Sequence, residues 1–179
     1  MKTLGLERST GECRNGDWVE RLELDGAERI VVGIGPGSFA GIRSAIAFAQ
    51  GYHLGRPQVE VLGLPSPCAI AAESDAPALA VVGDARQGKL WLALFENGTL
   101  TRPVFQLEAA DIAAAVPAAA SVASPDDRRI GARLRELFGE RYLGGKLPTA
   151  AGLVAYAERH PEALVREPLP IYLNPAVRN

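Results

Sequence analysis

The stretch Val31-Val32-Gly33-Ile34-Gly35-Pro36-Gly37-Ser38-Phe39-Ala40-Gly41-Ile42-Arg43 decides the fold of this 179-residue chain, because an apolar run breaks into glycines and then reopens as a helix. Residues 30–34 have the composition of a short buried strand. Ser38 is a good N-cap, and apolar residues follow it at helical spacing until Gly55 and Pro57. The predicted unit of strand, glycine turn and helix places main-chain N–H groups at the end of a parallel sheet, where α/β proteins bind ligands.

The composition is that of an ordinary globular protein, with 47% hydrophobic and 22% charged residues. A net charge of −2 gives no electrostatic footprint for autonomous binding to nucleic acid. No apolar run is long enough for a membrane helix, and the first residues lack the apolar core of a signal peptide. Cys13 and Cys68 are too few for a disulfide framework, so we expect a cytoplasmic protein without a membrane partner.

Two successive sets of predicted elements divide the chain. The first comprises strands at residues 2–7, 18–24, 30–34 and 59–62, with helices at 38–55 and 66–73. The second comprises strands at residues 79–82, 90–95, 100–105 and 119–123, with helices at 108–115, 126–138 and 149–159. The repeated order predicts an α/β fold of two tandem ribonuclease-H-like subdomains with mixed sheets, as in the actin-like superfamily. We expect the subdomains to span residues 1–76 and 77–179.

Three motifs support a resemblance to a known family. The stretch from Gly33 to Arg43 closely resembles the signature of the TsaB (YeaZ) family, in which GPGSF precedes a small residue, Gly, an aliphatic residue and Arg. The stretch from Val82 to Trp91 resembles that family's DAR-x-G-x-aromatic hairpin, and Pro170-Ile171-Tyr172-Leu173 is similar to its closing P-x-Y-L element. The matching loop residues are Gly35, Pro36, Gly37, Ser38, Gly41 and Arg43, and the matching hairpin residues are Asp84, Arg86 and Gly88.

The resemblance implies a non-catalytic subunit, without cofactor or metal, of the bacterial machinery that makes threonylcarbamoyladenosine in tRNA. The implied partners are the catalytic subunit TsaD and a TsaE-like ATPase, with tRNA contacted only through the complex. A homodimer is a second form of association that the sequence leaves open. We expect the partner interface on the helix after the glycine turn, at Phe39, Ile42, Ala45, Ile46 and Ala49.

Two departures distinguish the chain from the family pattern. The first strand ends in Leu6-Glu7-Arg8-Ser9-Thr10, whereas the family usually has Asp-Thr-Ser there, and Glu7 followed by Arg8 argues against an active nucleotide site. Residues 24–29 leave room for a turn only, where family members carry a helix, because a helix needs roughly ten residues. That helix normally forms part of the bundle with TsaD.

Structural interpretations of the same motifs stay open. The glycines of the loop either let the helix pack closely on the sheet or contact a ligand directly. Arg43, near a helix start where a cation is unfavourable, suggests a carboxylate partner or an interface role. Asp84 and Arg86 are more simply explained by local hydrogen bonds that stabilise the hairpin turn.

Catalytic motifs are missing from the sequence. His53 and His160 are far apart and have no neighbouring Cys or carboxylate cluster at metal-binding spacing. Neither a Gly-x-Ser-x-Gly elbow nor a Walker-type loop is present, so the old "glycoprotease" label gains no support. The main rival is a dinucleotide-binding oxidoreductase, because residues 35–40 formally fit G-x-G-x-x-A and Glu60 follows in the next strand. A third alternative is a self-associating family member that has lost the tRNA pathway.

Overall fold

The computed structural model describes residues 1–10, 24 and 26–173. Contacts within the chain divide it into two compact units. Unit 1 comprises Met1–Ala69 and Pro148–Ile171, and unit 2 comprises Ile70–Leu147 together with the C-terminal residues. The expected strand at residues 18–24 and Cys13 lie outside the described residues, apart from Leu24.

Unit 1 contains a parallel sheet whose strand order is β1-β2-β3. Its strands are β1 (Thr3–Leu6), β2 (Arg29–Gly33) and β3 (Glu60–Leu64). Leu4 lies opposite Ile30, and Ile30 lies opposite Val61, so their side chains share one face of the sheet. This near-continuous apolar composition is typical of strands that are covered on both faces.

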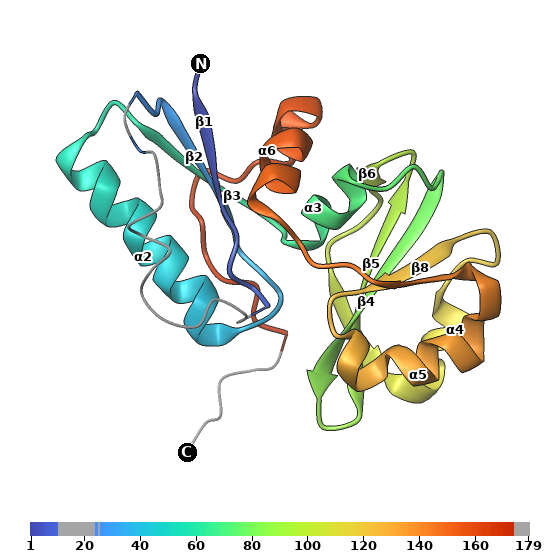
Figure 1. Ribbon diagram of the computed structural model, residues 1–179. Coiled ribbons are helices and arrows are strands. Elements are labelled where there is room, and N and C mark those ends of the chain that lie inside the picture. The colour runs from blue at the N-terminus through green and yellow to red at the C-terminus, as the bar shows by residue number, and fades with distance from the viewer. Residues whose placement is uncertain (11–23, 25, 174–179) are drawn as a thin grey trace. The chain divides into compact units, whose positions relative to one another are not determined.

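Two helices cover the opposite faces of this sheet (Figure 1). Helix α2 (Phe39–Gly55) packs an apolar stripe against the face that carries Ile30 and Val32. Helix α6 (Ala150–Arg159) packs against β1 and β2, and the main chain of Ala150 lies directly over Gly5. Ser38 and Thr149 cap these helices, because each side-chain oxygen accepts a hydrogen bond from the amide three residues later. The Ser38 cap agrees with the sequence prediction, whereas Thr149 was expected only as the first residue of its helix.

Unit 2 contains a mixed sheet with the order β6-β5-β4-β8-β9, in which β7 also pairs with β5. Strands β5, β6 and β7 join β4 as an antiparallel meander, whereas β8 and β9 are parallel to β4. Helices α4 and α5 pack on one face around Ile112 and Leu134 (Figure 1). The elements are β4 (Ala78–Arg86), β5 (Lys89–Glu96), β6 (Thr99–Leu100), β7 (Phe105–Glu108), α4 (Ile112–Ala115), β8 (Ser121–Ser124), α5 (Asp127–Phe138) and β9 (Tyr142–Gly145).

The remaining elements are short. Helix α3 (Pro67–Ala72) follows β3, and single 3₁₀ turns occur at Ala109–Asp111, Gly139–Arg141 and Pro161–Ala163. Among the described residues, no helix combines the length and the apolar character that crossing a lipid bilayer requires.

The element predictions agree with the structure in kind, with two differences. The expected return strand at residues 100–105 is split into β6 and β7, and strand β9 was not predicted. The division into units also differs from the expected boundary after residue 76. Residues 148–171 belong to unit 1, because α6 buries Leu153 and Tyr156 completely and packs on β1 and β2.

Gly83 in β4 provides a test of the packing in unit 2. A methyl group added at Gly83 would overlap the buried indole of Trp91, whereas one added at Gly51 in α2 would meet no atom within 4 Å. We expect Gly83→Ala to lower the free energy of unfolding by about 1–3 kcal/mol. Gly51→Ala should raise it by up to about 1 kcal/mol, because alanine favours helix. Thermal unfolding of both variants checks this contrast, and equal stability of the two would contradict it.

Candidate functional site

The glycine loop, residues 33–38, connects β2 to α2 in the predicted position. Gly35 has φ +93°, a conformation that side-chain-bearing residues rarely adopt, and the Gly35–Pro36 peptide bond is cis. The amide of Gly35 donates a hydrogen bond to the hydroxyl of Ser66, which follows β3 (3.1 Å). The Ser66 amide in turn donates a hydrogen bond to the Gly35 carbonyl (2.9 Å). The loop is therefore fixed to the end of the neighbouring strand.

Residues 7–9, which follow β1, fill the space over this loop. An added Cβ at Gly33 would overlap the Glu7 carboxyl, and one at Gly37 would overlap the main chain of Ser9. The carbonyl of Ser9 also accepts a hydrogen bond from the amide of Ser38, the N-cap of α2. An added Cβ at Gly41 would likewise overlap the carbonyl of Arg8. Gly37 and Gly41 thus make close contacts with the chain's own backbone, and Gly33 makes one with its own Glu7 side chain, which favours the packing interpretation of the motif.

The ionisable side chain of Glu7 lies at the centre of this arrangement. Its Oε1 accepts a hydrogen bond from the Ser9 amide (2.6 Å), while Oε2 is buried and has no hydrogen-bond partner among the described residues. Oε2 and the Ser66 hydroxyl both lie against the Cα of Gly33. Burial raises the pKa of the Glu7 carboxyl above its usual value, and the hydrogen bonds from Ser9 offset this only in part. Sequence reasoning identified Glu7 only as a departure from a family pattern.

Helix α2 places the predicted interface residues on two different faces. Ile42, Ala45, Ile46 and Ala49 are 0–7% exposed and belong to the core of unit 1, so we assign these four to the core. Their spacing of three and four residues is the usual signal of a buried helical stripe. Phe39, in contrast, is 55% exposed.

The opposite side of the helix, here called the α2 outer face, consists mostly of small residues flanked by apolar ones. The guanidinium of Arg43 lies 3.8 Å from the centre of the Phe39 ring, a cation–π geometry that explains a cation near the helix start. Leu54, at the other end, is 81% exposed. The α2 outer face is formed by Phe39, Ala40, Arg43, Ser44, Ala47, Gly51 and Leu54.

The hairpin motif forms the turn between β4 and β5. The Asp84 Oδ1 accepts a hydrogen bond from the Arg86 amide (2.8 Å), as the local interpretation predicts. Arg86, Gln87 and Gly88 all have positive φ, at +69°, +52° and +77°, and the strand register shifts after Asp84. Gly88 has no Cβ, so its positive φ carries no steric cost. The hairpin carboxylate therefore stabilises a backbone conformation that is unfavourable for two of its three residues.

Asp84 also connects the hairpin to the start of α5. Its Oδ2 lies 3.4 Å from a guanidinium nitrogen of Arg86 and 3.4 Å from one of Arg129. Its amide donates to the carboxylate of Asp126, the N-cap of α5 (2.9 Å). Burial, and the negative charge of Asp84, raise the pKa of Asp126, whereas the Asp84 amide and both arginines lower it. The Asp84 carboxylate is thus paired with both arginines, as expected of a structural network.

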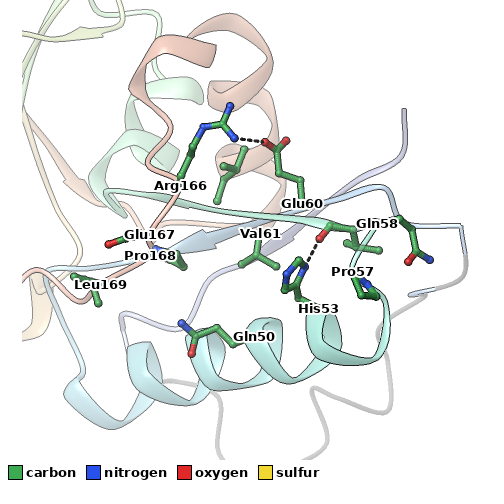
Figure 2. Close-up of a pocket in the computed structure, with 12 residues that line it drawn as sticks. Gln50, His53, Pro57, Gln58, Glu60, Val61, Arg166, Glu167, Pro168 and Leu169 are labelled. Atoms are coloured by element: carbon green, nitrogen blue, oxygen red, sulfur yellow. Dashed lines mark hydrogen bonds and ion pairs between the residues drawn. The ribbon is translucent and has the colours of Figure 1, made fainter.

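A groove of about 660 Å³ lies along the outer edge of β3 (Figure 2). Gln50 and His53 of α2 form one wall, and Arg166 to Leu169 form the opposite one. The His53 Nδ1 is 2.7 Å from the Val59 carbonyl, and the Glu60 carboxylate is paired with Arg29 at 3.0 Å. These side chains are engaged in structural contacts, and the groove pairs no nucleophile with a base.

Other reactive side chains are also engaged in the fold. Burial raises the pKa of the Cys68 thiol to about 12, so it is a buried small residue and not a thiolate nucleophile. The His160 ring stacks on Tyr156 and contacts Glu162 at 3.2 Å. Within residues 1–10 and 26–173, no three His, Cys, Asp or Glu side chains are close enough to hold a metal ion. The described groups thus provide no recognisable catalytic constellation.

Ala45 offers a direct test of which face of α2 is buried. Ala45 is fully buried against the sheet, so Ala45→Glu would place a carboxylate in the core without a partner. We expect a loss of most of the folding free energy, about 3–5 kcal/mol or more, and therefore largely unfolded protein. Far-ultraviolet circular dichroism and urea titration measure this loss. A folded Ala45→Glu variant would contradict the assignment.

The Asp84 carboxylate can be tested by two substitutions. Asp84→Ala removes both the acceptor for the Arg86 amide and the charge that faces Arg129, and we expect a loss of about 1–2 kcal/mol. Asp84→Asn keeps an acceptor oxygen and loses only the charge pairs, which are worth under about 1 kcal/mol at a surface. Urea titration at neutral pH should therefore rank Asn above Ala. Equal losses in the two variants would show instead that the charge pairs dominate.

Comparison with known proteins identifies relatives of this chain. A family model described as TsaD, tRNA N6-adenosine threonylcarbamoyltransferase, matches residues 20–129, more than half of the chain. The structure titled "YeaZ from Pseudomonas aeruginosa" matches with a TM-score of 0.71 at 20% identity, covering 96% of this chain and 100% of that one. No curated protein matched the sequence.

A second solved structure, titled as an uncharacterized protein with similarity to peptidase YEAZ from Pseudomonas aeruginosa, matches with a TM-score of 0.65 at 24% identity. It covers 88% of this chain and 79% of that one. Together these matches confirm the predicted actin-like, ribonuclease-H-like architecture and the resemblance drawn from the glycine loop. This chain therefore belongs to the family of the TsaD model and has the fold of the YeaZ (TsaB) proteins.

Proposed function

We propose that this chain is a non-catalytic, TsaB-type subunit that binds a TsaD-like catalytic subunit through the α2 outer face. Membership of the TsaD-model family supports a role in tRNA threonylcarbamoyladenosine modification. The observation that carries the docking proposal is the exposure of Phe39 and Leu54, 55% and 81%, at the two ends of one 17-residue helix. Exposed apolar side chains on an ordered helix are typical of a protein–protein interface.

Small residues between these two side chains suit a helical partner. Ala40, Ser44, Ala47 and Gly51 follow one another at spacings of three and four, so they form one smooth line along the α2 outer face. Side chains of this size let a second helix approach closely, near the short end of the 8–10 Å range of helix packing. The apolar side chains at either end would then anchor the partner helix.

The chemistry of the described residues supports a binding role over a catalytic one. The glycine loop is occupied by residues 7–9, which weighs against the rival dinucleotide-binding interpretation. That rival also requires an acidic residue free to bind a ribose, whereas the Glu60 carboxylate is paired with Arg29.

A TsaE-like ATPase would join the assembly, and tRNA would be contacted only through the complex.

The α2 outer face can be tested with a matched pair of substitutions. Ala47→Glu places a charge on the outer face, whereas Ala132→Glu places the same charge on the exposed side of α5. We expect both proteins to fold. Ala47→Glu should weaken co-purification with the TsaD homologue of the same cell at least tenfold, because a charge in the centre of an interface must be desolvated. Ala132→Glu should not.

Two results would contradict the proposal. Ala47→Glu protein that binds the TsaD homologue as tightly as the unmodified chain would exclude the α2 outer face as the docking surface. Light scattering of the purified chain distinguishes the alternative. A homodimer that Ala47→Glu dissociates, with no TsaD homologue captured by the unmodified chain, would assign this face to self-association.

A further inference from the structure

The main chain of β3 alternates between two sides along its length. Strand β3 is parallel to β2, and the Glu60 amide donates to the Glu28 carbonyl, next to the start of β2 (2.9 Å). In a parallel pair, a residue directs both of its main-chain groups toward the neighbouring strand, and the next residue directs both away from it. Every second residue from Glu60 therefore bonds toward β2. The residues between them face the outer edge of the sheet, and these are Val59, Val61 and Gly63.

Contacts within the chain occupy this outer edge on both sides of Val61. The Gly63 amide donates to the Val165 carbonyl at 2.8 Å, and the Val165 amide donates to the Gly63 carbonyl at 3.0 Å. The Val59 amide is bonded to the preceding turn, and its carbonyl lies 2.7 Å from the His53 Nδ1. Within the described part of the chain, no group forms a hydrogen bond with the N–H or C=O of Val61. One open position of a strand edge thus lies between two occupied ones.

Residues 164–171, here called the strap, turn away from the open position. If the strap continued antiparallel to β3 after Val165, Glu167 would lie opposite Val61. The Glu167 carbonyl instead accepts a hydrogen bond within the strap (2.9 Å), and Pro168 has no N–H to donate. The strap therefore leaves the edge and forms the far wall of the groove of about 660 Å³ (Figure 2).

An open strand edge at the base of a groove suits an extended peptide. Two residues that form a hydrogen-bonded pair between antiparallel strands exchange both of their main-chain bonds. One residue of an antiparallel ligand is therefore enough to bond the N–H and the C=O of Val61. Addition of a strand to a sheet edge is a common mode of peptide recognition. The occupied positions at Val59 and Gly63 confine the pairing to the ligand residues opposite 60–62.

Charges beside the open position indicate which side chains the peptide carries. The Val61 side chain packs on the α2 side of the sheet, so the side chains of Glu60 and Leu62 lie on the other side. The Glu60 carboxylate is paired with Arg29 at 3.0 Å and lies 3.9 Å from a guanidinium nitrogen of Arg166, whose side chain is 89% exposed (Figure 2). A ligand residue opposite Glu60 is therefore favoured when it is basic.

The neighbouring ligand residue has the opposite preference. The strap bonds to the residue after Leu62, which brings Arg166 beside the position opposite Leu62. An acidic ligand side chain at that position faces an exposed guanidinium. In an antiparallel ligand, the residue opposite Leu62 precedes the residue opposite Val61, and the residue opposite Glu60 follows it. The favoured order is therefore acidic, middle, basic.

We propose that the outer edge of β3 is a docking site for an extended segment of a partner protein with consecutive acidic, apolar and basic residues. The apolar residue pairs with the main chain of Val61 in the antiparallel orientation. Its side chain lies beside that of Val61, toward the groove wall that Gln50 and His53 of α2 form. This site is separate from the α2 outer face, so it does not depend on the proposed binding of a TsaD-like subunit.

The experiment adds the peptide acetyl-Thr-Glu-Val-Lys-Thr-amide to the full-length, ¹⁵N-labelled chain. We expect a saturable downfield shift of the Val61 amide proton, because this amide gains a hydrogen-bond acceptor. The Gly63 amide already bonds to Val165 and should shift less, so it serves as an internal reference. The peptide acetyl-Thr-Lys-Val-Glu-Thr-amide has the same composition with the charges exchanged. It should bind at least about fivefold more weakly, because both charged side chains then face like charges.

Two further changes separate main-chain pairing from charge attraction. N-methylation of the central valine of the first peptide removes the hydrogen that the Val61 carbonyl accepts, and it should weaken binding at least about tenfold. Arg166→Ala should reduce the preference for the first peptide over the charge-exchanged one. Arg128→Ala, at an exposed position of α5, is the matched control and should leave this preference unchanged.

Several results would overturn the proposal. One is the lack of a saturable Val61 shift with the first peptide, and another is equally tight binding of the N-methylated or the charge-exchanged peptide. Hydrogen exchange of the chain without peptide tests other occupants, and we expect the Val61 amide to be at least about tenfold less protected than the Gly63 amide. Strong protection of Val61 in dilute solution would assign the edge to this chain itself. Protection that appears only in concentrated solution would assign it to a second copy, and either result excludes a partner segment.

Discussion

Residues 7–9 pack so closely on the glycine loop that a side chain at Gly37 would meet the main chain of Ser9, and this contact determines where α2 begins. The Ser9 carbonyl accepts from the amide of Ser38, the N-cap of α2, so the helix starts from a fixed point. Ser66 holds the other side of the loop through its hydroxyl and its main chain. The ends of all three parallel strands are thereby joined at one place, and α2 follows from it in a defined direction.

This contact gives the glycine motif a meaning that differs from that of a phosphate loop. In a phosphate loop the amides at a helix N-terminus are left for an anion. Here the chain supplies its own acceptor, and Gly37 and Gly41 are required by the approach of backbone to backbone. The contact between residues 7–9 and the glycine loop also orients α2, so that one face of the helix lies in the core and the other lies in solvent. This arrangement suits a subunit that works by docking. The hairpin of unit 2 follows a similar logic, because Asp84 satisfies an amide of a strained turn and not an external ligand.

Several features were hidden from sequence reasoning for identifiable reasons. Strand β9 has the sequence Tyr-Leu-Gly-Gly, which lacks the apolar run or alternation that marks a strand. The return of residues 148–171 to unit 1 is a long-range packing event, and no local pattern encodes the sheet on which α6 packs. Glu7 was visible in the sequence only as a departure from the family pattern, because its contact with Gly33 joins the ends of two separate strands.

The sequence by itself determined most of the local elements, the Ser38 cap, the hairpin turn at Asp84 and Arg86 and the motifs that indicate the family, because each depends on neighbouring residues and their conformational preferences. It also contained the stripe of Ile42, Ala45, Ile46 and Ala49, although small apolar residues on a helix suit a core and an interface equally. Tertiary structure alone decided that this stripe is core and that the α2 outer face is exposed. The reason is physical: burial is a property of what lies opposite a side chain, and that neighbour comes from a distant part of the chain.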